Sequence, residues 1–361
     1  MKICFFAPSN SSHTKKWCRF FCDRGHEVHV ISFCEEEIEG AYLHYIPTSV
    51  DTSGGDGQKL GYLLKAGAFR RLVKEIDPDV LNVHYATSYG VVAALSGVRG
   101  YLLTVWGSDI YLFPRKSLLH KLLLQFSLKR AKILCSSSLA MAREAALYSK
   151  KKFEIIPFGV DLDLFSPRKR DRCNDGHFVI GTVKSLAPVY GIDHLLRAAA
   201  ILCEEHPEIS LKVRIAGDGP SREEYHQLSR DLGIDDITEW LGFISPEQAA
   251  KEWANMDLAV ICSRSESFGV SAVEAQACGC PLVISDIPGL KESACPGYSC
   301  VVAERNDPKH IAEAVLSLAK DPEKREELGQ NGRTYVEENF ELEKCFLKAE
   351  ELFCYALKKD R

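Results

Sequence analysis

The chain has 361 residues, of which 46% are hydrophobic and 26% charged, and its formal net charge is −5. This length allows two domains with full hydrophobic cores, and the composition is typical of a folded globular protein. The slightly acidic balance argues against a nucleic-acid-binding protein, whose surface needs an excess of Lys and Arg.

The first half of the chain alternates between short apolar runs and amphipathic segments. The apolar run at 3–7 is too short for a signal peptide or a membrane span, so we expect a buried strand there. Strands that alternate with helices predict a parallel sheet. The predicted strands are 3–7, 27–33, 80–84, 102–105 and 133–136, and the predicted helices are 14–25, 62–76 and 118–131.

A domain boundary is expected at 161–176, where a proline, a run of charges and a glycine leave little to bury. The alternation then resumes, with a turn expected at Pro288–Gly289. We therefore predict two doubly wound α/β domains, 1–165 and 172–340, which bind ligands at the carboxyl ends of their strands. The predicted strands are 178–180, 211–216, 237–241, 258–262 and 282–284, and the predicted helices are 221–233, 246–255, 270–278, 308–320, 322–338 and 341–359.

The 14 cysteines are scattered, and none has partners at a spacing that suits a zinc site. Most lie in apolar runs, where a reduced cysteine acts as a small hydrophobic residue. We therefore expect free thiols and a cytoplasmic protein. Two short aspartate pairs, at 77/79 and 161/163, imitate metal ligands but fall in a turn and in the linker, so no metal is assigned.

The most informative stretch is 263–292, which reads SRSESFGVSAVEAQACGCPLVISDIPGLKE. Its Ala-rich centre predicts a helix over 270–278, and Ser265 or Ser267 is expected to cap the start of that helix. Gly279 suits the left-handed residue that follows a helix, and the next proline prevents continuation.

Two glutamates flank the start of this helix, Glu266 before it and Glu274 within it. A helix N-terminus attracts anions through its unpaired N–H groups and partial positive charge, and Gly269 lets a ligand approach the backbone. Carboxylates accept hydrogen bonds from hydroxyls. A nucleoside diphosphate sugar combines these features, whereas the alternative is a surface helix with solvated glutamates.

The whole stretch resembles the Glu-x7-Glu signature of retaining glycosyltransferases of family four, which have the GT-B architecture. The resemblance covers nearly the whole chain and implies two Rossmann-like domains that face each other across a cleft, with residues 341–361 packing back onto the first. It also implies a hexosyltransferase that retains the anomeric configuration, with a UDP-sugar favoured over a GDP-sugar. The matching residues are Glu266, Phe268, Gly269, Glu274, Ala275, Ala277, Gly279, Pro281, Gly289 and Glu292.

The resemblance places the donor in the second domain, where Glu266 would hold hydroxyls of the transferred sugar and Glu274 the ribose. Lys184, in a loop after a strand, would meet the diphosphate as a compact charge. In this loop Thr182 stands where the family often has Arg, and Val189 or Tyr190 where it often has Lys. The other donor contacts that it implies are Phe268, Gly269, Val270, Ser185, Gly217, Gly242 and Phe243. The segments around Gly217 and Gly242 are also compatible with an ordinary turn and an ordinary strand end.

The acceptor is expected at strand ends of the first domain. Trp106 stands where the family often has a sugar-binding His, and Asp109 shortly after it is a candidate to bind an acceptor hydroxyl, with a catalytic role. His84 ends another strand, and His13 lies in the loop where many relatives have two glycines. For each of these side chains a purely structural role is the alternative.

The segment 113–132 combines an apolar helix with basic residues. A basic amphipathic helix can lie on an anionic membrane surface, so we expect peripheral membrane contact here, on the inner face of the membrane. The alternative is a helix that faces the core and turns its basic side to water.

Taken together, the residues and the resemblance predict transfer of a sugar from a nucleoside diphosphate donor to a carbohydrate or lipid-linked acceptor, with no cofactor required. Cell-surface polysaccharide or glycolipid synthesis is the expected setting. The alternatives are a non-hydrolysing nucleotide-sugar epimerase and a non-catalytic subunit that binds a nucleotide sugar.

Overall fold

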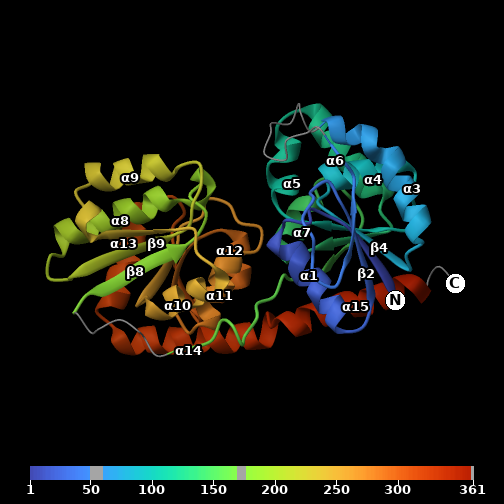
Figure 1. Cartoon of the computed structure of the whole chain (residues 1–361). Coiled ribbons are helices and arrows are strands. Elements are labelled where there is room, and N and C mark those ends of the chain that lie inside the picture. The colour runs from blue at the N-terminus through green and yellow to red at the C-terminus, as the bar shows by residue number, and fades with distance from the viewer. Residues whose placement is uncertain (49–59, 169–175, 359–361) are drawn as a thin grey trace. The chain divides into compact units, whose positions relative to one another are not determined.

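The computed structural model describes residues 1–48, 60–168 and 176–358. Its contacts divide the chain into two compact units. Unit 1 comprises Met1–Phe158 together with Cys345–Arg361, and unit 2 comprises Gly159–Lys344. Each unit is built on one parallel sheet, as Figure 1 shows.

Unit 1 contains a seven-stranded sheet in the order β3-β2-β1-β4-β5-β6-β7. Figure 1 shows helices α3, α4 and α6 over one face of this sheet and α1 with α15 over the other. The strands are β1 Lys2–Phe6, β2 Glu27–Ser32, β3 Tyr42–Tyr45, β4 Val80–His84, β5 Leu102–Val105, β6 Ile133–Ser136 and β7 Phe153–Ile155. The helices are α1 Ser12–Asp23, α3 Ala66–Ile76, α4 Ser88–Ser96, α5 Ser108–Tyr111, α6 Leu118–Arg130, α7 Leu139–Ala145 and α15 Leu342–Lys358, with 3₁₀ turns η1 Leu60–Lys65 and η2 Phe113–Arg115.

The last helix, α15, packs against α1 within unit 1. The rings of Trp17 and Phe346 lie 5.0 Å apart, and those of Phe21 and Phe353 5.2 Å apart. The carboxylate of Glu350 lies 2.8 Å from the guanidinium of Arg24. Buried aromatic pairs of this kind contribute more than their area alone, so they fix the chain's last helix on this unit.

Unit 2 contains a six-stranded parallel sheet in the order β10-β9-β8-β11-β12-β13. Figure 1 shows α8 and α9 on one face of this sheet and α10 and α11 on the other. The strands are β8 Phe178–Val183, β9 Leu211–Ala216, β10 Thr238–Gly242, β11 Leu258–Ile261, β12 Leu282–Ser285 and β13 Cys300–Ala303. The helices are α8 Ile192–Glu205, α9 Arg222–Asp231, α10 Pro246–Asn255, α11 Val270–Ala277, α12 Pro288–Ser293, α13 Pro308–Ala319 and α14 Pro322–Asn339, with 3₁₀ turns η3 Pro188–Tyr190 and η4 Asp235–Ile237.

The predicted fold class, two doubly wound Rossmann-like α/β domains, is confirmed. The turn expected at Pro288–Gly289 is wrong, because this pair opens α12. Proline is favoured in the first turn of a helix, where its missing N–H removes no hydrogen bond. Part of the helix expected over 62–76 is instead the 3₁₀ turn η1.

Two expectations from composition concern the thiols and the membrane. Every cysteine among the described residues is a free thiol. Within the same ranges, no helix combines the length and the apolar character that crossing a bilayer requires.

Candidate functional site

Lys184 and Glu266 form an ion pair at the carboxyl ends of two neighbouring strands of unit 2. Lys184 follows β8 and Glu266 follows β11, and these strands pair with each other in the sheet. The Lys184 Nζ lies 2.7 Å from Oε2 of Glu266, and both side chains are only 11% exposed. The hydroxyl of Ser263 also donates to this carboxylate, at 3.4 Å. The sheet therefore joins two predicted site residues that are 82 positions apart.

The electrostatics keep Lys184 charged. Burial lowers the pKa of Lys184, but the carboxylate of Glu266, together with Tyr190 and Glu274, raises it above the ordinary value. The Nζ atom also lies 4.4 Å from the centre of the Tyr190 ring. Since Glu274 acts on Lys184, the second predicted glutamate contributes to the same local field. The site thus holds one cation on which two carboxylates act.

Glycines allow the loops around this ion pair to approach one another closely. Gly217 has a φ of 139°, and a Cβ there would lie 1.9 Å from the carbonyl oxygen of Lys184. A Cβ on Gly289 would lie 2.2 Å from the carbonyl oxygen of Glu266. The N–H of Gly217 donates to the carbonyl of Gly242 at 2.7 Å. Side chains at these glycines would displace the loops that carry the charged pair.

Helix α11 begins beside this pair. The predicted cap by Ser265 or Ser267 is wrong, because Gly269, at a φ of 91°, occupies the N-cap and no side chain in the described part of the chain caps the helix. The hydroxyl of Ser271 donates to the carbonyl of Val183 at 2.9 Å and so fixes the first turn to β8. A helix start without a side-chain cap leaves its partial positive charge available to an anion. Gly279 is left-handed, with a φ of 71°, as predicted.

The other predicted donor contacts differ in how open they are. The Phe268 side chain is buried and packs against Phe340, at 5.2 Å between ring centres, so only its backbone can serve a ligand. Val270 is half-buried at the start of α11. Ser185 is exposed, and its hydroxyl donates to the carbonyl of Asp218 at 3.2 Å. Phe243 is 85% exposed and available to an aromatic partner.

Arg264 is a member of this loop cluster that the sequence analysis did not assign. Its guanidinium lies 2.6 Å from the carboxylate of Asp193 and also donates to the carbonyl of Pro188. The backbone N–H of Arg264 donates to the carbonyl of Val189 at 2.8 Å. Arg264 therefore ties the loop before Glu266 to the loop after Lys184. Its position two residues before Glu266 is the signal that was available.

In unit 1, Asp109 serves the local backbone. Its side chain is fully buried and accepts hydrogen bonds from the N–H groups of Ala86, Trp106 and Gly107, at 2.8, 3.1 and 2.7 Å. Burial raises the pKa of Asp109 above its ordinary value, although these donors act in the opposite direction. These hydrogen bonds fix the ends of β4 and β5, which agrees with the structural alternative, and the acceptor contact and catalytic role of Asp109 stay predictions.

The remaining acceptor candidates form a group of rings in unit 1. His13 stacks on Phe158 at 4.1 Å and meets the edge of Trp106 at 5.6 Å, and His84 lies 5.4 Å from Trp106. Within the described ranges, Nδ1 of His13, both ring nitrogens of His84 and Nε1 of Trp106 are buried without a hydrogen-bond partner. Burial lowers the pKa of His13 to about 4 and that of His84 to about 3. Both histidines are therefore neutral near pH 7.

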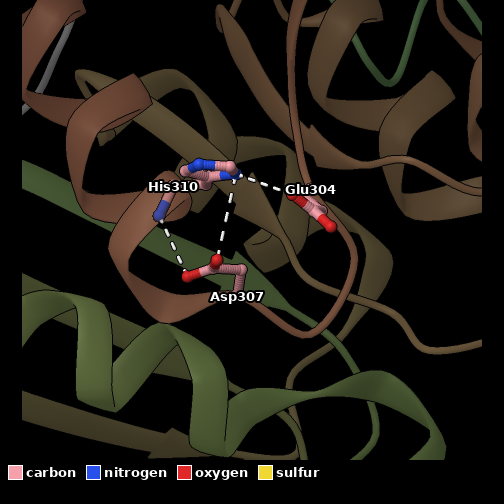
Figure 2. A group of neighbouring side chains, drawn as sticks. All are labelled: Glu304, Asp307 and His310. Carbon is pink, nitrogen blue, oxygen red and sulfur yellow. Dashed lines mark hydrogen bonds and ion pairs between the residues drawn. The ribbon is translucent and has the colours of Figure 1, made fainter.

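A second group of polar side chains lies after β13. Figure 2 shows the ring of His310 beside the carboxylates of Glu304 and Asp307, with Nδ1 at 3.2 and 3.9 Å from them. Asp307 also caps α13 by accepting from the N–H groups of Lys309 and His310. Exposed ion pairs and a helix cap account for this arrangement.

Two family models match most of the chain. The model described as "Glycosyl transferase 4-like" matches residues 2–138, and the model described as "Glycosyl transferases group 1" matches residues 167–335. An uncharacterized glycosyltransferase of Methanocaldococcus jannaschii is 26% identical over 91% of this chain and 89% of its own length. The N-acetyl-alpha-D-glucosaminyl L-malate synthase of Bacillus anthracis is 24% identical over 94% and 92%. A D-inositol 3-phosphate glycosyltransferase of Corynebacterium kroppenstedtii is 35% identical, but over 51% of this chain and 44% of its own.

Solved structures share the fold over the full length. Sucrose-phosphate synthase from Thermosynechococcus elongatus has a TM-score of 0.85 at 19% identity and covers 99% of both chains. The Anabaena protein HepE, solved with UDP and glucose, has a TM-score of 0.81 at 18% identity and covers 98% of this chain and 99% of its own. The two family-model matches and the full-length relatives support assignment of the chain as a glycosyltransferase, and the solved structures show that it shares their fold.

Proposed function

We propose that this glycosyltransferase moves a hexose from a nucleoside diphosphate donor to an acceptor hydroxyl and retains the anomeric configuration. The observation that carries the proposal is the Lys184–Glu266 pair at the start of α11, with Glu274 on the same helix. A cation and a helix N-terminus suit the diphosphate, and the two carboxylates suit hydroxyls on either side of it. UDP is the favoured nucleotide, and the HepE structure, which was solved with UDP and glucose, supports this choice.

Each side chain has a distinct task in this proposal. The ammonium of Lys184 has three donor positions, so it can keep Glu266 in place and also bind a phosphate oxygen. Glu266 accepts from hydroxyls of the transferred sugar, and Glu274 accepts from the ribose. The backbone at Gly269 and the N–H groups that follow it meet the developing charge on the leaving diphosphate, which is an electrostatic stabilisation that requires no reorganisation.

The reaction breaks the bond between the anomeric carbon and the diphosphate oxygen and forms a bond from that carbon to the acceptor oxygen. The acceptor's proton passes to the departing diphosphate on the same face of the sugar, so charge and atoms balance without an oxidant. We invoke no enzyme nucleophile. NMR of the product's anomeric proton tests retention, because inversion would exclude same-face transfer.

The ring group of unit 1 is the proposed acceptor site. His13 is neutral and partly exposed, so its ring offers one donor and one acceptor nitrogen, and the partly exposed Trp106 adds an indole N–H donor. His84 is fully buried and packs against Trp106 from within the fold, at 5.4 Å between ring centres. Such a set suits an uncharged, hydroxyl-bearing acceptor, such as a glycan or the sugar of a glycolipid. Cell-surface polysaccharide or glycolipid synthesis is the setting that we propose.

The test measures transfer directly. Purified protein is incubated with UDP-, GDP- and ADP-sugars, alone and with cell extract, and the products are identified by mass spectrometry. We expect nucleotide release and a sugar adduct only when an acceptor is present. Conversion of the donor to an isomer without an acceptor would identify an epimerase, and binding without turnover would identify a non-catalytic subunit.

The matched variants are Glu266→Ala and Glu304→Ala. We expect the first to reduce transfer by well over roughly tenfold, since it removes a contact to the reacting sugar. Glu304 is exposed and lies after β13, so its variant should keep full activity. Near-normal transfer by a folded Glu266→Ala variant would reject the proposed role.

A further inference from the structure

Four leucines at the start of α6 and just before it face solvent in unit 1. Leu118 is 72% exposed, Leu119 61%, and Leu112 and Leu122 52% each. Leu118, Leu119 and Leu122 follow the i, i+1, i+4 spacing and therefore share one side of the helix. We call Leu112, Leu118, Leu119 and Leu122 the leucine face. Removing these side chains from water is favourable, so this surface is a strong site for association.

The leucine face is not the side of α6 that holds the fold together. The buried residues of α6 are Leu124, Ser127 and Leu128, and the two leucines belong to the core of unit 1. The helix is thus apolar on its inner side and, over its first turns, also on its outer side. The alternative expected from the sequence, a helix that turns only basic residues to water, does not describe these exposed leucines.

The segment that carries the leucine face has cations but no carboxylates, and Glu144, just beyond this segment, pairs with Arg115 at 2.8 Å. No Asp or Glu occurs between Asp109 and Glu144, although the chain as a whole has a net charge of −5. The cations of this segment are Arg115, Lys116, Lys121, Lys129, Arg130, Lys132 and Arg143. All of them except Lys132 are exposed. An acid-free, basic segment around exposed leucines complements a partner that is apolar and anionic at once.

We propose that the leucine face and its surrounding cations dock unit 1 on an anionic lipid bilayer. The leucines enter the boundary between headgroups and acyl chains, and the cations lie at the level of the phosphates, whose negative charge attracts them. The 13 residues of α6 span about 20 Å, less than the hydrocarbon thickness, so the helix lies along the surface.

Other partners fit this surface less well. A nucleic acid would use the cations but not the leucines, because its recognition rests on phosphate contacts. A second copy of the chain would bring two basic segments together and so repel itself. The proposal does not depend on the proposed reaction, since lipid binding is measured without donor or acceptor.

The experiment is vesicle flotation of the full chain at physiological salt. We expect the protein to float with vesicles of phosphatidylcholine and phosphatidylserine and to stay behind with phosphatidylcholine alone. The double change Leu119→Glu and Leu122→Glu should reduce the bound fraction by more than about tenfold, because it places carboxylates at the lipid boundary. The double change Lys116→Glu and Lys121→Glu should reduce binding and weaken its dependence on salt.

Controls separate lipid binding from folding and self-association. Tyr298→Glu, at an exposed ring of unit 2, should float like the original chain. Thermal melting checks that each variant is folded. Failure of the original chain to float with anionic vesicles would overturn the proposal, as would unchanged binding by the folded leucine variant. Light scattering that shows a dimer dissolved by the leucine changes would assign the face to a second copy instead.

Discussion

The two polar groups of this glycosyltransferase differ in how their side chains are satisfied. In unit 2, Lys184 and Glu266 form an ion pair at 2.7 Å. In unit 1, His13 and His84 are neutral, and their buried ring nitrogens include three without partners in the described part of the chain. The side chains of the unit 2 pair are hydrogen-bonded to each other without a ligand, whereas the unit 1 group keeps ring nitrogens that have no hydrogen-bond partner among the described residues.

This difference indicates two ways to receive a substrate. A diphosphate that reaches Lys184 must share a cation already held by Glu266, which favours a charged and precisely placed ligand. A buried nitrogen without a partner costs about 1–3 kcal/mol, which a hydroxyl group or a water molecule relieves. The charged group therefore suits the step in which charge develops, and the neutral group suits recognition of an uncharged molecule.

The largest expected effect comes from separating the charged pair. Lys184→Ala should reduce the rate of transfer by about 10²–10³, because it removes a cation placed where the leaving diphosphate gains charge. The double variant Lys184→Ala, Glu266→Ala should be slower than Lys184→Ala by less than the loss that Glu266→Ala causes alone, since Lys184 also holds Glu266 in place. The measurement is single-turnover kinetics with saturating donor. Additive losses in the double variant would break the comparison, because the two residues would then act independently.

The next effect concerns the backbone that carries the pair. Gly217→Ala places a Cβ against the carbonyl of Lys184 at a φ of 139°, so the loop must move. We expect a loss of roughly 1–3 kcal/mol in the free energy of unfolding and weaker donor binding. The control is Gly233→Ala, at a φ of 69° with open space around its Cβ position. Its strain should lower stability alone and leave the affinity for UDP unchanged, as isothermal calorimetry would show.

The sequence predicts the helices and strands of this fold better than it predicts the contacts between them. Strand β4 and helix α10 have the predicted bounds, because each has a clear apolar pattern with stop signals at its ends. Helix α4 was missed since it is buried on nearly all sides and lacks an amphipathic period. Strand β3 was missed because its Tyr and His residues form no apolar run.

The candidate site shows the same division. The resemblance selected Lys184 and Glu266, but only the sheet order explains why they meet. No local pattern indicates that Arg264 pairs with Asp193, because that contact spans 71 positions. Asp109 has the chemistry of an acceptor ligand, but its burial and its three backbone donors, which favour a structural role, could not be read from the sequence. Residue type limits what a side chain can do, whereas burial and partners determine which of those roles it has.

The third expected effect is on the pH dependence of folding stability, and it tests whether the buried His84 of unit 1 is neutral. Burial lowers the pKa of His84 to about 3 from an ordinary value of 6.5. Between these values the unfolded chain binds the proton and the folded chain does not, so stability is lost as the pH falls below about 6.5. The slope for one such group approaches about 1.4 kcal/mol per pH unit.

His84→Phe should therefore flatten the fall in Tm between pH 6.5 and 4.5, which is measured by thermal melting in a buffer series. His310→Phe is the control, since the ring of His310 is exposed. If His84→Phe left the pH profile unchanged, His84 would not be a neutral, buried group, and the contrast between the two units would lose its basis.

The smallest expected effect comes from Arg264, which positions the loops of the unit 2 site. Arg264 joins the two loops through Asp193, but both side chains are partly exposed, at 33% and 22%. Arg264→Ala should therefore lower the free energy of unfolding by only about 1 kcal/mol. Donor affinity should fall by a few-fold, because Arg264 positions the loops and we assign it no ligand contact.

A double-mutant cycle with Asp193→Asn isolates this pair, and the exposed pair Lys324–Glu327 provides a reference cycle. We expect coupling for Arg264–Asp193 and almost none for the reference, because the first pair is the more buried. A loss of transfer as large as that of Lys184→Ala would contradict a positioning role. Arg264 would then belong with the residues that meet the diphosphate, and unit 2 would hold two cations where we assign one.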